Sequence, residues 1–424
     1  MASKQDLPNF SLPGTGKTLT ALNAAKLVGA NSGLILCPRI ALSMWQETIE
    51  DFFGVKARIL RTGNDAIGPE PFIVTTYDLA PKLAAKLTER FDDKVQVLIN
   101  DESHYIKSVT AQRTKAVFGS MCESRLGGLA THFDQVWNMT GTPITAFADD
   151  MWSQVGLFHQ DAFKQYGTSY TAFKRGFTFS QLKSFHPRMP KAPKIVANTN
   201  ERLLHKIVYE DIGAIRRQAL DGLPALRTRE FLVPVSLPLV AKASLRDMTP
   251  EKIIVALNDP DSIVSKIRKL EGTIKVPYVG EYVVEAARSS PVLLGVWHND
   301  VGAAYEAFFK KAGLRAVRVY GGTNTNLHDS IRHDFNAGKT DVLIGQMQAM
   351  GVSWNIQKAS AHVCIAEDHP SPSIIEQFYK RVYRYGQENP VQLDLFISNT
   401  LIGHSIKQVR EAKHGSQRRI NDGK

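Results

Sequence analysis

Cysteine is scarce in this sequence, and Cys37, Cys122 and Cys364 lie far apart and form no C-x-x-C pair. An odd number of isolated cysteines argues against a disulfide framework, and we expect no structural zinc. Cys37 and Cys364 each lie in a short apolar run, which favours buried thiols. No apolar run reaches the roughly 18 residues that a membrane-spanning helix requires, so we expect no membrane partner.

Acidic residues are outnumbered, because 41 Asp and Glu face 52 Lys and Arg, which gives a net charge of +11. A basic surface attracts polyanions such as nucleic acid or acidic membranes. Charge alone leaves the question open, since solvated lysines would give the same sum. The opening residues, MASKQDLPNF, lack the apolar core of a secretory signal, which predicts a cytoplasmic protein.

Short apolar runs alternate with amphipathic stretches in both halves of the chain, a pattern typical of parallel α/β layers. In the first half, strands are predicted at Gly33–Cys37, Phe72–Thr75, Val95–Asn100 and Val136–Met139. A helix is predicted from about Ile40 to Phe53, where apolar residues recur on one face. In the second half, strands are predicted at Val292–Val296, Ala316–Val319, Asp341–Ile344, His362–Ala366 and Gln392–Phe396. Asp300 is expected to cap the helix after the first of these.

The middle of the chain is less regular and is predicted to be a mainly helical insertion and connection. Within it, Phe185–Lys194 is rich in proline and basic residues and is expected to be a loop. We therefore expect a first lobe over residues 1–150, the insertion over 151–290, a second lobe over 291–400 and a basic tail over 401–424. The tail is predicted to be a frayed, solvated end.

The strongest local motif is Pro13-Gly14-Thr15-Gly16-Lys17-Thr18. Backbone N–H groups of Gly14, Thr15 and Gly16 would cradle phosphate oxygens at the start of a helix. Lys17 would pair with the β- and γ-phosphates of ATP, and Thr18 would bind Mg²⁺. Ser11 stands where the usual pattern begins with Gly. The alternative is an ordinary Gly/Thr loop before a helix.

Two carboxylates, Asp101 and Glu102, follow a predicted apolar strand. That position places them at the carboxyl edge of a sheet, where ligands bind in such folds. Asp101 can hold Mg²⁺ through water, and Glu102 can orient and deprotonate an attacking water. The alternative is a helix cap followed by a solvated acid.

Gln377, Arg381 and Arg384 are spaced by four and three residues, which predicts that they share one face of a helix. Two arginines on one face can meet a triphosphate from an opposite lobe, where an arginine finger neutralises charge on the γ-phosphate. The alternative is a basic, solvent-exposed helix.

Further segments complete an ordered series: Leu34–Pro38 followed by Trp45, Val74–Tyr77, Asp101–His104, Thr140–Pro143, Gly272–Val276 through Tyr282, Gly321–Thr323, Gln348–Val352 and the stretch from Gln377 to Gln387. In this order they resemble the motifs of superfamily-two helicase-type ATPases, specifically the Swi/Snf-related group and its compact annealing-helicase-like branch. The resemblance runs from about Phe10 to Ile397. It implies two RecA-like α/β lobes, each a mostly parallel sheet flanked by helices.

The resemblance also implies roles for individual residues. Gly14–Thr18 match motif I, Asp101–His104 match motif II, and Gln377, Arg381, Arg384 and Gln387 match motif VI. Thr140, Gly141 and Thr142 match motif III, which couples the ATP site to the track. Contacts with the nucleic-acid backbone are implied for Arg39, Thr76, Gly322, Thr323 and Gly351. The family also has an adenine-recognising glutamine segment upstream, but only sixteen residues precede Lys17 and Gln5 fits poorly.

The sequence therefore predicts an ATP- and Mg²⁺-dependent motor on DNA, with duplex DNA favoured and mainly phosphate contacts. A strand-separating DNA or RNA helicase would share the same motifs. An alternative of another class is a non-hydrolysing nucleic-acid-binding protein on a decayed motor fold. The small size points to a prokaryotic or phage-infected cell.

Overall fold

The computed structural model describes residues 6–91, 96–120, 127–183, 192–217, 222–257, 259–350, 354–384 and 386–423. The chain divides into two compact units. The first unit comprises Met1–Ala219 and Gly415–Lys424, and the second comprises Leu220–His414. Cys122 and Gln5 lie outside the described residues.

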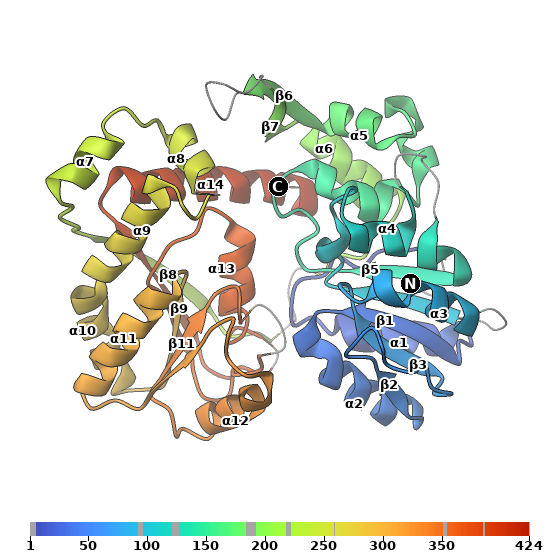
Figure 1. Cartoon of the computed structure of the whole chain (residues 1–424), viewed down its shortest axis with the longest axis horizontal. Coiled ribbons are helices and arrows are strands. Elements are labelled where there is room, and N and C mark those ends of the chain that lie inside the picture. The colour runs from blue at the N-terminus through green and yellow to red at the C-terminus, as the bar shows by residue number, and fades with distance from the viewer. Residues whose placement is uncertain are drawn as a thin grey trace. The chain divides into compact units, whose positions relative to one another are not determined.

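The first unit contains a five-stranded parallel sheet (Figure 1). Its strands, in spatial order, are β2 (Ala57–Ile59), β3 (Phe72–Thr76), β1 (Ser32–Cys37), β4 (Gln96–Asp101) and β5 (Gln135–Met139). The predicted strands are confirmed to within one residue at each end, apart from Val95, which lies outside the described residues. Every residue of β1, β3 and β4 is buried, as a parallel sheet covered on both faces requires.

The main helices of this sheet are α1 (Lys17–Leu27), α2 (Leu42–Phe53), α3 (Ala80–Arg90) and α4 (Gln112–Phe118). A 3₁₀ turn at Arg39–Ala41 precedes α2, so that helix begins two residues later than predicted. Leu42, Trp45 and Ile49 form its buried face. Cys37 is buried at the end of β1, as predicted.

An extended segment before the phosphate loop lies beside β5. Asn9 N–H donates to Asn138 O (2.9 Å), and Thr140 N–H donates to Asn9 O (3.1 Å). On its other side, Phe10 N–H donates to Ile215 O (2.8 Å). The backbone leading into the phosphate loop is therefore held on both sides.

Residues 151–217 belong to the first unit and contain α5 (Tyr170–Phe177), α6 (Glu201–His205) and an antiparallel hairpin of β6 (Thr178–Lys183) and β7 (Ala192–Asn198). The hairpin corrects part of the predicted loop, because residues 192–194 begin β7; residues 185–191 lie outside the described residues. Short 3₁₀ and π turns occur at Ser103–Ile106, Gly128–His132, Ala148–Met151, Trp152–Gly156, Gln160–Tyr166 and Lys206–Asp211.

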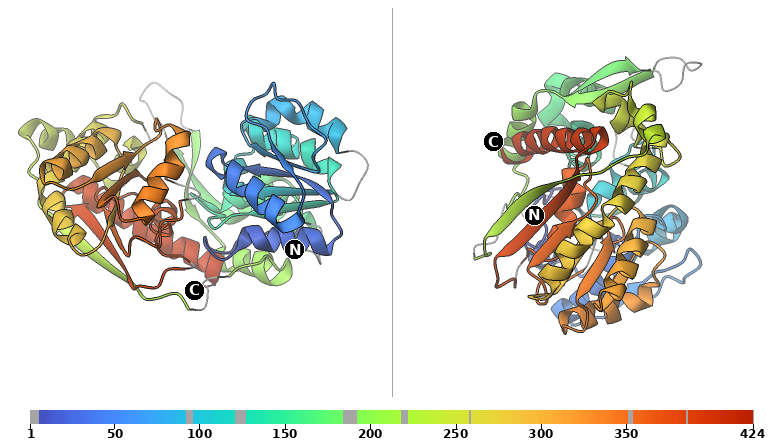
Figure 2. Two further views of the ribbon diagram at one scale, coloured as in Figure 1. Left: turned by 90° about the horizontal axis from the view of Figure 1, so that it is seen from below. Right: turned by 90° about the vertical axis from the view of Figure 1, so that its left-hand side faces the viewer.

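The second unit has a six-stranded parallel sheet in the order β10 (Ala316–Val319), β11 (Val342–Gln346), β9 (Val292–Val296), β12 (His362–Ile365), β13 (Val391–Ser398) and β8 (Leu226–Val233). The five predicted strands are confirmed. β8 was missed because most of its side chains are exposed and charged residues interrupt its apolar pattern. Figure 2 shows β8 lying along β13 at the sheet's edge.

The helices of the second unit are α7 (Leu239–Leu245), α8 (Pro250–Ala256), α9 (Ile263–Ile274), α10 (Val276–Ala287), α11 (Asn299–Lys311), α12 (Thr325–Asn336) and α13 (Pro372–Tyr379). The prediction that Asp300 caps α11 is wrong, because His298 is the N-cap. Glu367 accepts hydrogen bonds from His298 N–H and the His298 ring, which holds the chain extended there. Asp300 lies in the first turn and pairs with Lys269.

The C-terminal segment is a single helix, α14 (Leu401–Asp422), and not the frayed end predicted. Its first part belongs to the second unit, where Ile402 and Ile406 are buried. From Gly415 onward it belongs to the first unit, where Ile420 is fully buried in the core and Gln417 Nε2 donates to Ile144 O (3.0 Å). The few isoleucines of this helix are buried and hold it against the two cores. Polar residues surround them in the sequence, so no apolar pattern indicated the helix.

Among the described residues, no helix, α14 included, combines the length and the hydropathy that crossing a membrane demands.

We predict that Ile420→Ala lowers the free energy of unfolding of the first unit by about 2–5 kcal/mol, because it leaves a cavity in a packed core. Leu401→Ala, at a residue that is 40% exposed on the same helix, is the matched control and should change little. Urea unfolding of both variants measures the difference. Equal midpoints for Ile420→Ala and the unaltered chain would show that the helix end is not part of this core.

Candidate active site

The carboxyl ends of four parallel strands bring the predicted motifs of the first unit to one edge of its sheet. Cys37, Thr76, Asp101 and Met139 end β1, β3, β4 and β5. The residues that follow them therefore share the edge at which α/β sheets bind ligands. Chain segments far apart in sequence meet there because the strands are parallel.

The phosphate loop has the conformation that its glycines permit. Gly14 and Gly16 have φ values of 84° and 82°, in the left-handed region that side chains disfavour. Lys17 opens α1, and its Nζ donates to Ser11 O (3.0 Å) and Leu12 O (3.3 Å). Thr18 is the second residue of the helix. The Lys17 ammonium is thus folded over its own loop, where phosphate oxygens can replace the two carbonyls.

Asp101 is a buried carboxylate, 8% exposed, at the end of β4. Burial and the neighbouring Glu102 raise its pKa to about 6, whereas Trp45 and Lys17 oppose that shift. Trp45 Nε1 donates to Asp101 Oδ2 (2.8 Å), and Tyr77 Oη donates to the Asp101 carbonyl (2.6 Å). Trp45, which follows the Leu34–Pro38 segment of the motif series, is fully buried beneath Asp101.

Glu102 has a left-handed backbone, with φ 54° and ψ 50°, which is rare for a residue with a side chain. Its Oε2 accepts from Thr140 Oγ1 (3.1 Å) and lies 3.2 Å from His104 Nδ1. Thr142 N–H donates to Thr140 Oγ1 (3.1 Å). Motifs II and III are therefore joined directly through the Glu102 carboxylate, which we expected to orient water. Gly141 lies between the two threonines of this arrangement.

Gln154, which was not predicted, supports this arrangement from beneath. It is 1% exposed and accepts from Ser103 Oγ (2.8 Å) through Oε1. Its Nε2 donates to Pro143 O (2.8 Å). No local pattern in the sequence marks this residue, because its role depends on contacts 11 and 51 residues away.

A pocket of about 320 Å³ lies at the same edge. Arg39 and Thr76, the two predicted backbone-contacting residues of the first unit, both line it, as does the unpredicted Arg61. Arg39 and Arg61 are exposed, so the pocket offers two cationic groups beside a threonine, and its one acidic lining residue, Asp78, pairs with Arg113 (3.4 Å). This chemistry suits a phosphate group.

Gln377, Arg381 and Arg384 do not share a helix face, which corrects the prediction. Gln377 lies in α13, but that helix ends at Tyr379. Tight turns follow, with Arg381 N–H donating to Phe378 O (3.1 Å) and Arg384 N–H to Val382 O (3.1 Å). Arg381 is 6% exposed, and burial lowers the pKa of Arg384.

The other motif residues of the second unit form turns at strand ends. Gln387 Nε2 donates to Gln357 O (3.0 Å) and Ser360 O (2.9 Å), so it pins the segment after α13. After β10, Thr323 Oγ1 accepts from Tyr320 N–H (2.9 Å), which closes the turn containing Gly322. Gly351 lies outside the described residues.

Lys275, which belongs to the Gly272–Val276 segment of the motif series, is buried under the sheet edge. Its Nζ donates to Ala366 O (2.5 Å) and Phe396 O (2.8 Å). Burial lowers its pKa to about 8. Lys275 thus fixes α9 and α10 to the ends of β12 and β13.

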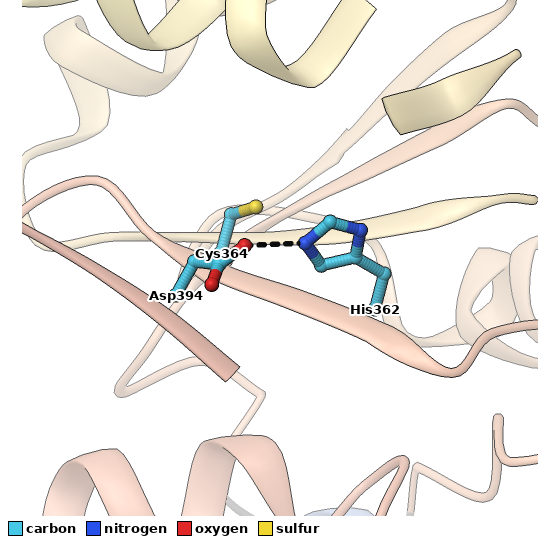
Figure 3. A group of neighbouring side chains, drawn as sticks. All are labelled: His362, Cys364 and Asp394. Carbon is cyan, nitrogen blue, oxygen red and sulfur yellow. Dashed lines mark hydrogen bonds and ion pairs between the residues drawn. The ribbon is translucent and has the colours of Figure 1, made fainter. Parts of the chain in front are cut away.

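His362, Cys364 and Asp394 are the group of described residues whose spacing could hold a metal ion (Figure 3). Asp394 instead accepts from His362 Nε2 (2.6 Å), Tyr282 Oη (2.6 Å) and the Arg229 guanidinium (2.9 Å). Burial raises the pKa of the Cys364 thiol, so a thiolate ligand is disfavoured. The donor set fits a hydrogen-bond network that fastens β8, β12 and α10 to β13.

Comparisons with known proteins agree with this motif order. The family described as "Type III restriction enzyme, res subunit" matches residues 11–144, and "Helicase conserved C-terminal domain" matches residues 274–386. A Caenorhabditis elegans protein described as "SWI/SNF-related matrix-associated actin-dependent regulator of chromatin subfamily A-like protein 1 homolog" is 26% identical over 412 residues, which cover 91% of this chain and 55% of that protein.

The human "DNA annealing helicase and endonuclease ZRANB3" is 23% identical over 407 residues, covering 91% of this chain and 36% of that protein. The chain therefore spans about half, or less, of the length of these relatives. Among solved structures, Saccharomyces cerevisiae Dbp5 bound to RNA and ADP BeF3 is 13% identical, with a TM-score of 0.54, covering 96% of this chain and 82% of that one. This likeness establishes two RecA-like lobes.

The Asp394 network should stabilise the second unit in a pH-dependent way. Its hydrogen bonds hold the pKa of Asp394 below its usual range despite burial, so the stabilisation is present above the unfolded pKa and is lost as pH falls through the folded one. We predict that Asp394→Asn costs about 1–3 kcal/mol at pH 7 and less in acid. Urea unfolding at pH 7 and pH 3 tests this, with the exposed Glu388→Gln as control. A loss that is equal at both pH values would contradict it.

Proposed function

Because this chain belongs to the Swi/Snf-related group of superfamily-two helicase-type ATPases, we propose that it is an ATP-driven motor that moves along DNA, with duplex DNA as its track. The observation that carries the proposal is the edge of the first unit's sheet. There, the phosphate loop, the Asp101–Glu102 pair and motif III lie beside a pocket lined by Arg39 and Thr76.

ATP would bind at the phosphate loop. Backbone N–H groups of Gly14, Thr15 and Gly16 would receive its phosphates, and Lys17 would exchange its two loop carbonyls for β- and γ-oxygens. The Thr18 hydroxyl and the Asp101 carboxylate are oxygen donors of the kind that Mg²⁺ prefers. When bound, Mg²⁺ would neutralise charge on the phosphates.

Glu102 would orient and deprotonate the attacking water. Its hydrogen bond from Thr140 supports a coupling role for Thr140, Gly141 and Thr142, since any shift of that segment moves the carboxylate. We assign to Gln377 a contact with the nucleotide. Arg381 and Arg384 would stabilise negative charge on the γ-phosphate.

The track would be held mainly through its phosphates. Arg39 and Thr76 would act from the first unit, and Gly322, Thr323 and Gly351 from the second. Contacts of this kind position a motor without reading base sequence. Binding should therefore weaken steeply as salt rises.

We predict that duplex DNA stimulates ATP turnover more than single-stranded DNA or RNA does. Steady-state turnover with each nucleic acid, and with none, measures this. Stimulation by RNA alone would contradict the DNA track. Release of a labelled strand, measured in parallel, would indicate a strand-separating helicase.

Two variants separate binding from chemistry in the same assay. Lys17→Ala and Glu102→Gln should each reduce turnover by roughly 100-fold or more, as loss of a charge-stabilising or proton-accepting group does. Glu102→Gln should still bind ATP, because it keeps the phosphate loop intact. Normal hydrolysis by Arg384→Ala would remove its assigned role.

Trp45 gives a test that depends on pH. Its hydrogen bond lowers the pKa of Asp101, so Trp45→Phe should raise that pKa above about 6 and move the acid limb of ATP turnover to higher pH. We predict about a threefold loss at pH 6, for a hydrogen bond worth roughly 1 kcal/mol, and little loss at pH 8.5.

Trp137→Phe is the matched control, because Trp137 is equally buried in the first unit and its indole nitrogen has no partner among the described residues. It should leave the pH profile in place. A Trp45→Phe loss that is the same at both pH values would mean that Trp45 acts only through packing.

A further inference from the structure

We propose that the β6–β7 hairpin of the first unit binds unpaired DNA strands, with the Phe179 ring as a platform on which a base stacks. The inference rests on the proposed function, because it gives the same DNA a second contact. It concerns a part of the chain that none of the helicase motifs includes.

The hairpin exposes two large apolar side chains that would be buried if they served only to pack the fold. Phe179 is 51% exposed and Leu182 is 66% exposed. Their cross-strand partners are Ala197 and Pro193, which are too small to cover them. An isolated two-stranded hairpin is marginally stable in water, and these two exposed side chains are available for contact with a ligand.

The base of the hairpin is nevertheless fixed to the first unit. Phe177, directly before β6, is buried in the core, and Thr178 Oγ1 donates to Lys174 O (2.6 Å). At the other end, Asn198 Oδ1 accepts from Ala148 N–H (2.8 Å). Ala148 follows motif III by a few residues, so the hairpin is anchored to the segment that we propose couples ATP to the track. Figure 1 shows the hairpin on the side of the first unit where α5 and α6 lie.

The charge of this region suits a polyanion. The described residues within 174–200 include four basic ones, Lys174, Arg175, Lys183 and Lys194, and no Asp or Glu, in a chain where 41 of 424 residues are acidic. The acids on either side are already engaged. Asp149 accepts from Tyr170 Oη (2.9 Å), and Glu201 accepts from Ser416 and Arg419. The strands β6 and β7 themselves contain no acidic residue that would repel a phosphate backbone.

The exposed ring selects unpaired strands over duplex. A duplex presents phosphates and groove edges, which lysine and arginine suffice to bind. Base faces become available only where strands part, and stacking on an aromatic side chain is then worth about 1–3 kcal/mol per base. An aromatic residue within a basic, acid-free hairpin therefore indicates a fork or a single-stranded arm.

The test compares forked DNA, carrying 2-aminopurine in one unpaired arm, with a blunt duplex, both without ATP. Phe179→Ala should weaken fork binding about tenfold and leave duplex binding within about twofold of the unaltered chain. Phe179→Trp should restore fork binding and the fluorescence change of the stacked 2-aminopurine. Leu239→Ala, at an 83% exposed residue of the second unit, is the control and should bind both DNAs normally.

Fork binding that is unchanged in Phe179→Ala, or lost equally for fork and duplex, would overturn the proposal. So would a change in oligomeric state or in binding to anionic lipid vesicles with fork binding intact, because the hairpin would then serve a protein or a membrane. The two proposals fail separately. If DNA does not stimulate ATP turnover by the unaltered chain, the motor fails, whereas the fork-selective loss is measured without ATP.

Discussion

The first unit is organised around one difficult constraint, which is to keep a negative charge at Asp101 in a nearly water-free position. Burial drives this carboxyl toward its neutral form. Three groups oppose that tendency: the Trp45 indole from α2, the Lys17 ammonium from α1 and the backbone N–H of Glu102, directly after β4. The helices that cover the sheet therefore also set the electrostatics of its edge, and packing and chemistry depend on the same contacts.

The second unit treats its buried charges differently. Asp394 receives hydrogen bonds from four side chains, and the Lys275 ammonium donates to two backbone carbonyls. The hydrogen-bond partners of both groups belong to the protein itself, and the bonds connect strands to helices. In the first unit, the interactions of Lys17 are with loop carbonyls that a phosphate can replace. Asp394 and Lys275 therefore stabilise the second unit, whereas Lys17 is available to bind a ligand.

The sequence predicted the features that depend on local pattern. Buried parallel strands are continuous apolar runs, so nine of them could be placed closely, and the phosphate loop is a contiguous motif. Features that depend on distant contacts were missed. β8 is an exposed edge strand, and Trp45 meets Asp101 across 56 residues. The spacing of Arg381 and Arg384 predicted that both lie on one helix, but the helix ends at Tyr379. Residue periodicity does not show where a helix gives way to turns. The roles of the site residues remain predictions.

The division of the chain into units has a consequence for biosynthesis. The first unit needs Ile420 and its neighbours in α14, yet the ribosome makes the whole of the second unit before it reaches them. Domains that are contiguous in sequence can fold in order as they emerge. Here the earlier lobe cannot complete its core until the later lobe has been synthesised. Until then, its unfinished apolar surface would be a natural substrate for chaperones, and nascent chains stalled between the two would be exposed to proteolysis.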